Sequence, residues 1–166
     1  MKLPEKTKNK LKSKKILLIK PQEDSRGFQG YLMSRFDKQF RYLGLDTICL
    51  DQNDRDFPKN LFNALNEKDV FHFGLFFYDM LLHSFPGLNN SHGSNNVFEL
   101  LDIPTFPVMG DHAFAKFMIS RMSGMPSGAH VLYAIHDIKD ELALIRKDIN
   151  SLSAFPQFSL AERVIK

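Results

Sequence analysis

Five short apolar segments, separated by stretches with helical spacing, constrain the fold of this chain more than any other feature. They lie at 15–20, 45–51, 69–77, within 103–114, and at 129–136. Each apolar run is short and rich in aliphatic or β-branched residues, which favours buried strands over helices. The connections between them are too long for hairpins. We therefore expect parallel pairing through right-handed crossovers.

This alternation predicts an α/β fold, a three-layer sandwich with an open, mostly parallel five-stranded sheet of Rossmann-like or flavodoxin-like type. The segment 69–77 is apolar on both faces apart from His72, which places it in the middle of the sheet. His72 and His130 lie inside strands, and we expect both to be structural. Helices are expected over Phe28–Gly44, from near Pro58 (carrying Leu61, Phe62 and Leu65), over 97–103, over 113–122 and over 137–147.

A length of 166 residues fits one domain with one core. We expect a flexible, lysine-rich tail over 1–14 and a Rossmann-like α/β domain over 15–150. Residues 151–166 are interpreted as a C-terminal extension or the start of a linker, since their last residues resemble a helix that is just beginning. The turn-rich stretch 88–96 predicts an exposed loop, either a functional lid or a plain surface connection.

The net charge of +3 is concentrated at the start of the chain. Seven lysines and one glutamate give residues 1–15 a charge of +6, so the remainder carries −3. A lysine-rich arm can bind nucleic acid or anionic lipid through counterion release, but no aromatic residue is interleaved with these lysines. A solvated, disordered tail is the preferred interpretation, and a nucleic-acid partner is not expected.

Cys49 is the single cysteine of the chain. This excludes an intramolecular disulfide framework and a C-x-x-C redox pair. Its apolar, strand-like neighbours favour an inert buried thiol over a nucleophile. No apolar run approaches the roughly 20 residues of a membrane span, and no signal-peptide core is present. The expectation is a cytoplasmic protein without a membrane span.

Residues that follow the strands are the candidate ligand site, because a doubly wound sheet binds ligands beyond the carboxyl ends of its strands. The first strand is followed by Arg26, Gly27 and Gly30. They open a helix whose first N–H groups could hold a phosphate, with the planar guanidinium of Arg26 as the anion contact. The complete dinucleotide and P-loop glycine patterns are absent. A tight turn with glycine for close packing is therefore the alternative.

Two pairs of carboxylate and imidazole follow the fourth and fifth strands, namely Asp111 with His112 and His136 with Asp137. Such groups could contact a ligand, bind a divalent metal or perform acid–base chemistry. Asp111 and Asp137 also stand directly before helical segments, where Asp is a common N-cap. No tight metal-ligand spacing is present, so neither a metal site nor a cofactor is predicted. Helix capping and ligand contact stay as alternatives.

The segment I-P-T-F-P-V-M-G-D-H-A-F, residues 103–114, resembles part of the N-terminal, Rossmann-like half of CgeB-like, two-domain (GT-B type) bacterial glycosyltransferases. In that family an I-P-T lead-in and an apolar strand end in a turn of the form D-D-P-F. The segments K-I-L-L-I, D-V-F-H-F-G and the strand before Asp137 extend the resemblance over roughly 15–141. Asp111 aligns with the first family Asp, whereas His112 and Ala113 replace the second Asp and the Pro.

The resemblance implies a half that shapes the acceptor side, while a C-terminal half holds most nucleotide-sugar contacts. This chain has room only for the first, so the expected function is that of an acceptor-side domain that is non-catalytic on its own. Its expected partners are a sugar or nucleotide-sugar ligand and a separate C-terminal transferase domain. If it acts, Asp111 would be the catalytic base or would orient an acceptor hydroxyl. The substrate-binding candidates are Arg26, Gly27, Gly30, His112, His136 and Asp137.

The alternative function is a flavodoxin-like small-ligand-binding or regulatory module without enzymatic turnover. The sequence lacks a complete set of catalytic residues, which favours this second hypothesis. It also contains no G-x-S-x-G elbow that would support acyl transfer.

Overall fold

The computed structural model describes residues 14–22, 27–75, 96–109, 122, 124–133, 141, 143–144 and 146–153, and for 151–153 only the backbone. Among these residues, those up to Phe71 form one compact unit and those from His72 form a second. Residues 1–13 of the predicted tail, residues 88–95 of the predicted loop, most of the predicted helix over 113–122 and residues 154–166 of the predicted extension lie outside the described residues.

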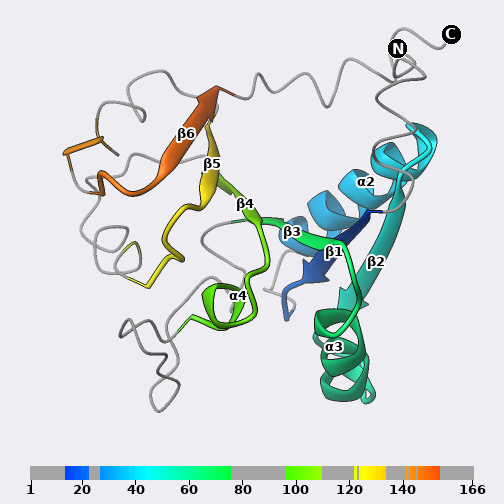
Figure 1. Ribbon diagram of the computed structural model, residues 1–166. Coiled ribbons are helices and arrows are strands. Elements are labelled where there is room, and N and C mark those ends of the chain that lie inside the picture. Colours follow the sequence, from blue (N-terminus) through cyan, green and yellow to red (C-terminus); the bar gives the residue numbers. More distant parts are fainter. Residues whose placement is uncertain are drawn as a thin grey trace, which may run out of the picture. The chain divides into compact units, whose positions relative to one another are not determined.

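The described residues form an α/β fold with one open parallel sheet (Figure 1), as predicted, consistent with a Rossmann-like or flavodoxin-like sandwich. The five predicted strands are present and a sixth is added, in the order β2-β1-β3-β4-β5-β6. Their bounds are β1 Lys15–Lys20, β2 Asp46–Asp51, β3 Val70–Leu75, β4 Thr105–Met109, β5 His130–Tyr133 and β6 Asn150–Ser153.

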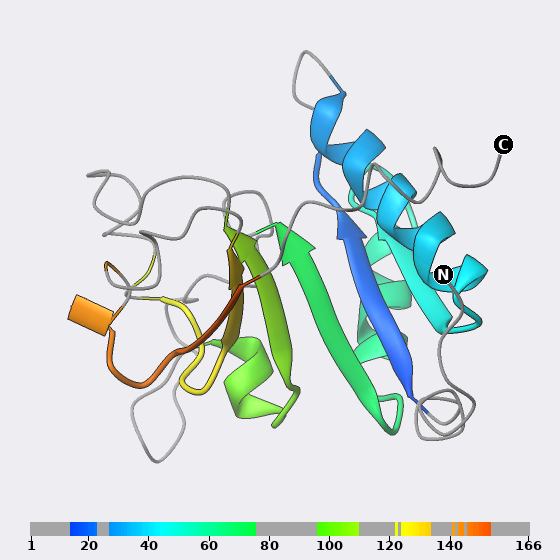
Figure 2. The ribbon, with the colours of Figure 1, turned by 90° about the horizontal axis from the view of Figure 1, so that it is seen from above.

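Strand β1 carries the core of the first unit. Its four central residues, Ile16 to Ile19, are at most 1% exposed. It pairs in parallel with β2 from Lys15 opposite Asp46 to Lys20 opposite Asp51. Figure 2 shows helices α2 (Phe28–Tyr42) and α3 (Phe57–Leu65) on opposite faces of this strand pair. A strand covered on both faces requires apolar residues without alternation, which is the pattern K-I-L-L-I-K supplies.

Helix α2 buries part of the apolar face that the sequence predicts. That face consists of Tyr31, Leu32, Phe36, Phe40 and Leu43. The structure buries Phe36 as predicted, together with Gln29 and Met33, whereas Tyr31 is 59% exposed. The Tyr31 ring lies beneath the guanidinium of Arg35, 5.9 Å from its centroid, where a cation–π contact makes exposure tolerable. The predicted helix stop is confirmed, because Gly44 follows with a left-handed φ of 79°.

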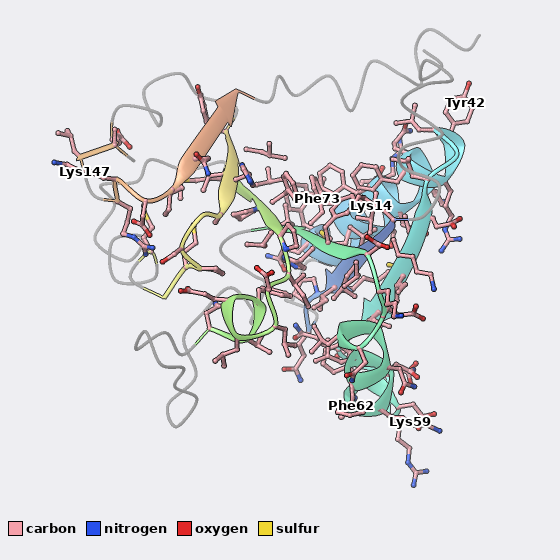
Figure 3. All side chains as sticks on the ribbon, viewed as in Figure 1. Lys14, Tyr42, Lys59, Phe62, Phe73 and Lys147 are labelled. Atoms are coloured by element: carbon pink, nitrogen blue, oxygen red, sulfur yellow. The ribbon has the colours of Figure 1, made fainter. Side chains whose placement is uncertain are left out.

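Helix α3 begins as predicted with Pro58 in its first turn. Its buried residues are Phe57 and Ala64, and Phe62, predicted as part of the apolar face, is 69% exposed. Figure 3 shows Lys59 and Phe62 projecting from this helix away from β1 and β2. A nine-residue helix on an edge strand has only one narrow inward stripe, and Phe62 does not fall on it.

In the second unit, strands β3 to β6 pair in parallel from neighbour to neighbour. Helix α4 covers only Val97–Leu100, shorter than the predicted helix over 97–103. It stops because Asp102 adopts a positive φ of 53° and the Ile103 amide donates to the Phe98 carbonyl at 2.8 Å. This turn leads directly into β4. Over all the ranges described, no helix has both the length and the apolar character to cross a membrane.

Candidate functional site at the carboxyl ends of β1 and β2

Two of the predicted site residues, Gly27 and Gly30, belong to the described part of the chain. The others, Arg26, Asp111, His112, His136 and Asp137, lie outside it. Strands β4 and β5 end at Met109 and Tyr133, just before the predicted carboxylate and imidazole pairs. The convergence of those pairs stays a prediction.

Gly27 is explained by its backbone conformation. It precedes α2 with φ 60° and ψ 9°, a left-handed geometry that glycine adopts without steric cost. A Cβ built at Gly27 or at Gly30 would meet no described atom within 4 Å. Among the described residues, the interpretation of close packing at these two glycines is therefore not supported.

The start of α2 carries the positive end of the helix dipole. Its first turn contains no acidic residue, and the residue before it, Gly27, has no side chain to cap the first N–H groups. Neither Gly27 nor the first turn of α2 therefore offsets the partial positive charge of these N–H groups.

Gln52 ties the carboxyl ends of β1 and β2 together. Its backbone amide donates to the Lys20 carbonyl at 3.1 Å, and its side-chain Oε1 accepts from the Gln22 amide at 3.1 Å. The Gln52 Nε2 group is buried and has no hydrogen-bond partner among the described residues. A buried donor without an acceptor costs about 1–3 kcal/mol. Within the described part of the chain, the carboxyl edge of the sheet thus holds a buried donor without an acceptor.

The carboxylate of Asp51 is held at the end of β2 by the turn that follows. Its Oδ1 accepts from the Asn53 amide at 2.9 Å and from Asn53 Nδ2 at 3.1 Å. Asp54 makes the same kind of contact with the backbone two residues further on, since its Oδ1 accepts from the Asp56 amide at 3.0 Å. Such turns fix a loop through its own side chains. The sequence places 51–54 at a strand end, but nothing in the pattern singles out Gln52.

His72 is confirmed as a structural residue. It is fully buried, its Nδ1 lies 2.8 Å from Thr105 Oγ1, and its ring stacks on Phe98 with centroids 4.3 Å apart. Asn96 is buried nearby, caps α4 by accepting from the Phe98 amide, and donates to the Gly124 carbonyl at 3.0 Å. These polar groups stabilise the second unit through their buried contacts.

Cys49 is half-buried on β2. Burial is the largest influence that raises the pKa of its thiol, and the nearby carboxylate of Asp37 raises it further. A thiol that resists ionisation is a poor nucleophile, which agrees with the inert thiol predicted from the sequence.

Arg146 and Asp148 form a structural clamp in the second unit. The guanidinium contacts the carboxylate through two bonds of 2.7 and 2.5 Å and also donates to the Met122 and Met125 carbonyls at 2.6 and 3.2 Å. The hydrogen bond from Arg146 lowers the pKa of Asp148 to about 2. The predicted helix over 137–147 is wrong at its end, because Arg146 and Lys147 are not helical and the arginine serves this clamp.

No known protein family, curated protein or solved structure matches this chain. Within the described ranges, no group of three or more His, Cys, Asp or Glu residues is arranged to hold a metal ion.

Proposed function

We propose that this chain is a Rossmann-like domain that serves the acceptor side of a glycosyltransferase and does not catalyse transfer alone. A separate C-terminal transferase domain would supply the nucleotide-sugar donor. In this proposal Asp111 is the base or the group that orients the acceptor hydroxyl, and Arg26 contacts an anionic group. A cytoplasmic location is part of the proposal.

The observation that carries the proposal is the open parallel sheet, because its strand β4 lies within the segment 103–114 that resembles the transferase family. Ligands of such sheets bind beyond the carboxyl ends of the strands. The resembling residues from Gly110 to Phe114 directly follow β4 in the sequence, where the fold class positions a ligand.

A second function, a small-ligand-binding module without turnover, is favoured by the geometry at the ends of β1 and β2. The buried Gln52 Nε2 donor and the first N–H groups of α2, which the N-cap residue Gly27 does not cap with a side chain, offer hydrogen-bond donors to an anionic or hydroxyl-bearing ligand. Neither group transfers protons or forms a covalent intermediate, so this edge by itself supports binding and not catalysis.

A transfer assay tests the first function. The full chain is incubated with nucleotide-sugar donors and saccharide acceptors, with and without a separately expressed C-terminal transferase half. Transfer is expected only in the mixture, and Asp111→Ala should lower its rate about a hundredfold or more, the usual contribution of a general base. Asp69→Asn, an exposed carboxylate just before β3 where Asn also tolerates the positive φ of 59°, is the control. Full activity of Asp111→Ala would refute the base assignment.

A thermal-shift screen of nucleotides, nucleotide sugars and simple anions tests the second function. A ligand at a hundred times its Kd stabilises the folded state by about 2.7 kcal/mol. For a chain of this length that corresponds to a rise in Tm of about 5–10 °C. A ligand that raises the Tm without transfer in the mixture supports the binding module. Transfer in the mixture supports the first function.

A further inference from the structure

A groove between β2 and α3 in the first unit is separate from the carboxyl edge of the sheet. It has a volume of about 400 Å³, within the range of about 300–1,000 Å³ typical of small-molecule sites. We name it the β2–α3 groove. Its floor is aliphatic and consists of Ile48 and Leu50 from the strand and Ala64 from the helix. Such a floor suits a ligand with an apolar face.

The rim of the groove also carries two neutral amides and one carboxylate. Asn60 and Asn63 line it from α3 and Asp46 lines it from β2. Among the described residues, the side chains of these three make no hydrogen bond or ion pair. Asn60 shares one stripe of α3 with the buried Phe57 and Ala64, a position that a simple amphipathic helix would give to an apolar residue.

The cations at the rim are already engaged. Lys15 Nζ lies 2.8 Å from Glu67 Oε2. The Arg41 guanidinium donates to Asp37 Oδ1 at 2.9 Å and to the Thr47 carbonyl at 3.1 Å. Neither cation is available as the main contact of a phosphate without breaking these bonds. The groups left for a ligand are two amides, which donate and accept, and one carboxylate, which accepts.

The charges of the lining residues balance, because Lys15 and Arg41 offset Asp46 and Glu67. A neutral lining favours a neutral ligand over a nucleotide or a polyamine, since a highly charged ligand would lose its hydration without a compensating partner. A neutral ligand with hydroxyl groups on its edges and C–H groups on its face matches both the rim and the floor.

We infer that the β2–α3 groove binds a neutral saccharide of one or two residues. Its hydroxyl groups donate to Asp46 and exchange hydrogen bonds with Asn60 and Asn63, and its C–H face packs on Ile48 and Leu50. The site lies along the flank of β2 and not at its carboxyl end, so this inference goes beyond the proposed function. Binding here is expected whether or not the chain takes part in transfer.

The experiment is a titration of the full, isotopically labelled chain with glucose, galactose, N-acetylglucosamine, lactose and cellobiose, followed by amide chemical shifts. A saturable response to at least one sugar, concentrated in 46–50 and 57–67, is expected. Asn60→Ala and Asn63→Ala should each raise the Kd about threefold to tenfold, the value of one neutral hydrogen bond. Both substitutions raise helix propensity, so the fold should persist. Lys59→Ala, on the same helix but outside the groove, should leave the Kd unchanged.

Three results would overturn the inference. The first is the absence of a saturable response to all five sugars. The second is a saturable response of these segments to inorganic phosphate or to a nucleotide but to no sugar. The third is a sugar response that persists unchanged in the Asn60→Ala, Asn63→Ala double variant, since the groove would then not be the site. The amide shifts are independent of transfer, so failure of the proposed function leaves this test intact.

Discussion

Replacing Gln52 with Met tests the assignment of an unpaired donor at the carboxyl edge of the sheet. The substitution keeps the length and flexibility of the side chain but removes both of its polar atoms. The Nε2 group that is buried without a partner disappears, and so does the acceptor for the Gln22 amide. Gln22 is exposed, so water can take over its amide.

The expected magnitude follows from these two changes. Removal of an unpaired buried donor relieves about 1–3 kcal/mol, and loss of one exposed hydrogen bond costs about 0.5–1.5 kcal/mol. The Gln52→Met variant should therefore be as stable as the parent or more stable by about 1 kcal/mol. A polar residue whose removal does not destabilise the fold is typical of a binding position.

Urea unfolding, followed by circular dichroism, measures this change. With a slope of about 1–3 kcal/mol/M, a gain of about 1 kcal/mol moves the midpoint upward by about 0.3–1 M. Gln22→Ala is the matched control, because it retains the backbone amide that donates to Gln52 and should leave the midpoint unchanged. A fall in stability of more than about 1 kcal/mol for Gln52→Met would refute the reasoning, since the amide would then be making a favourable bond.

Four further substitutions test the local structure. Gly27→Ala should lower the free energy of unfolding by about 1–2 kcal/mol because of its left-handed φ. Gly30→Ala, in the first turn of α2, should raise the free energy of unfolding by about 0.5–1 kcal/mol. Urea midpoints equal to that of the parent chain would contradict both predictions. Thr105→Val should cost about 1–3 kcal/mol because it removes the buried partner of His72 Nδ1, which thermal unfolding measures. The folded-state pKa of Asp148 is depressed from 3.8 to about 2, so its stabilisation is present above pH 3.8 and is lost as the pH falls through 2. Solvent screening of this 43%-exposed side chain limits that contribution to about 1 kcal/mol, and Asp148→Asn should abolish this pH dependence of the urea midpoint.

The central strands could be predicted from the sequence because their buried positions are filled by consecutive apolar residues. The four aliphatic residues of β1 have no polar neighbour among them, and the predicted bounds Lys15–Lys20 match the structure. Strand β6 gave no such signal. Asn150–Ser153 contains one apolar residue, Leu152, and is held by its parallel backbone pairing with β5. Backbone hydrogen bonds between strands do not require apolar side chains, so the hydropathy pattern of the sequence does not reveal them.

The candidate site could be predicted only in part for a related reason. The strand ends located the turn after β1 and the turn after β2, and Gly27 is where a left-handed residue is needed. The role of Gln52 depends on which backbone amide lies 3.1 Å from its side chain, a contact between turns 30 residues apart. The inward stripe of α2 could be predicted only in part, because Phe36 lies on it as expected whereas Gln29 and Met33 complete it and Tyr31 is exposed.

Arg41 affects whether two copies of this chain can pair through the edge of the sheet. Strand β2 is the first in the sheet order, so one of its edges has no neighbour among the described strands. The Gln52 amide points toward β1, and backbone groups alternate along a strand, so the Thr47 carbonyl points outward. The Arg41 guanidinium donates a hydrogen bond to that carbonyl and another to Asp37 Oδ1. The unpaired edge of a strand can pair with a strand of another chain and so lead to aggregation. The Arg41 guanidinium places a positive charge at the Thr47 carbonyl, where a second chain would form its hydrogen bonds.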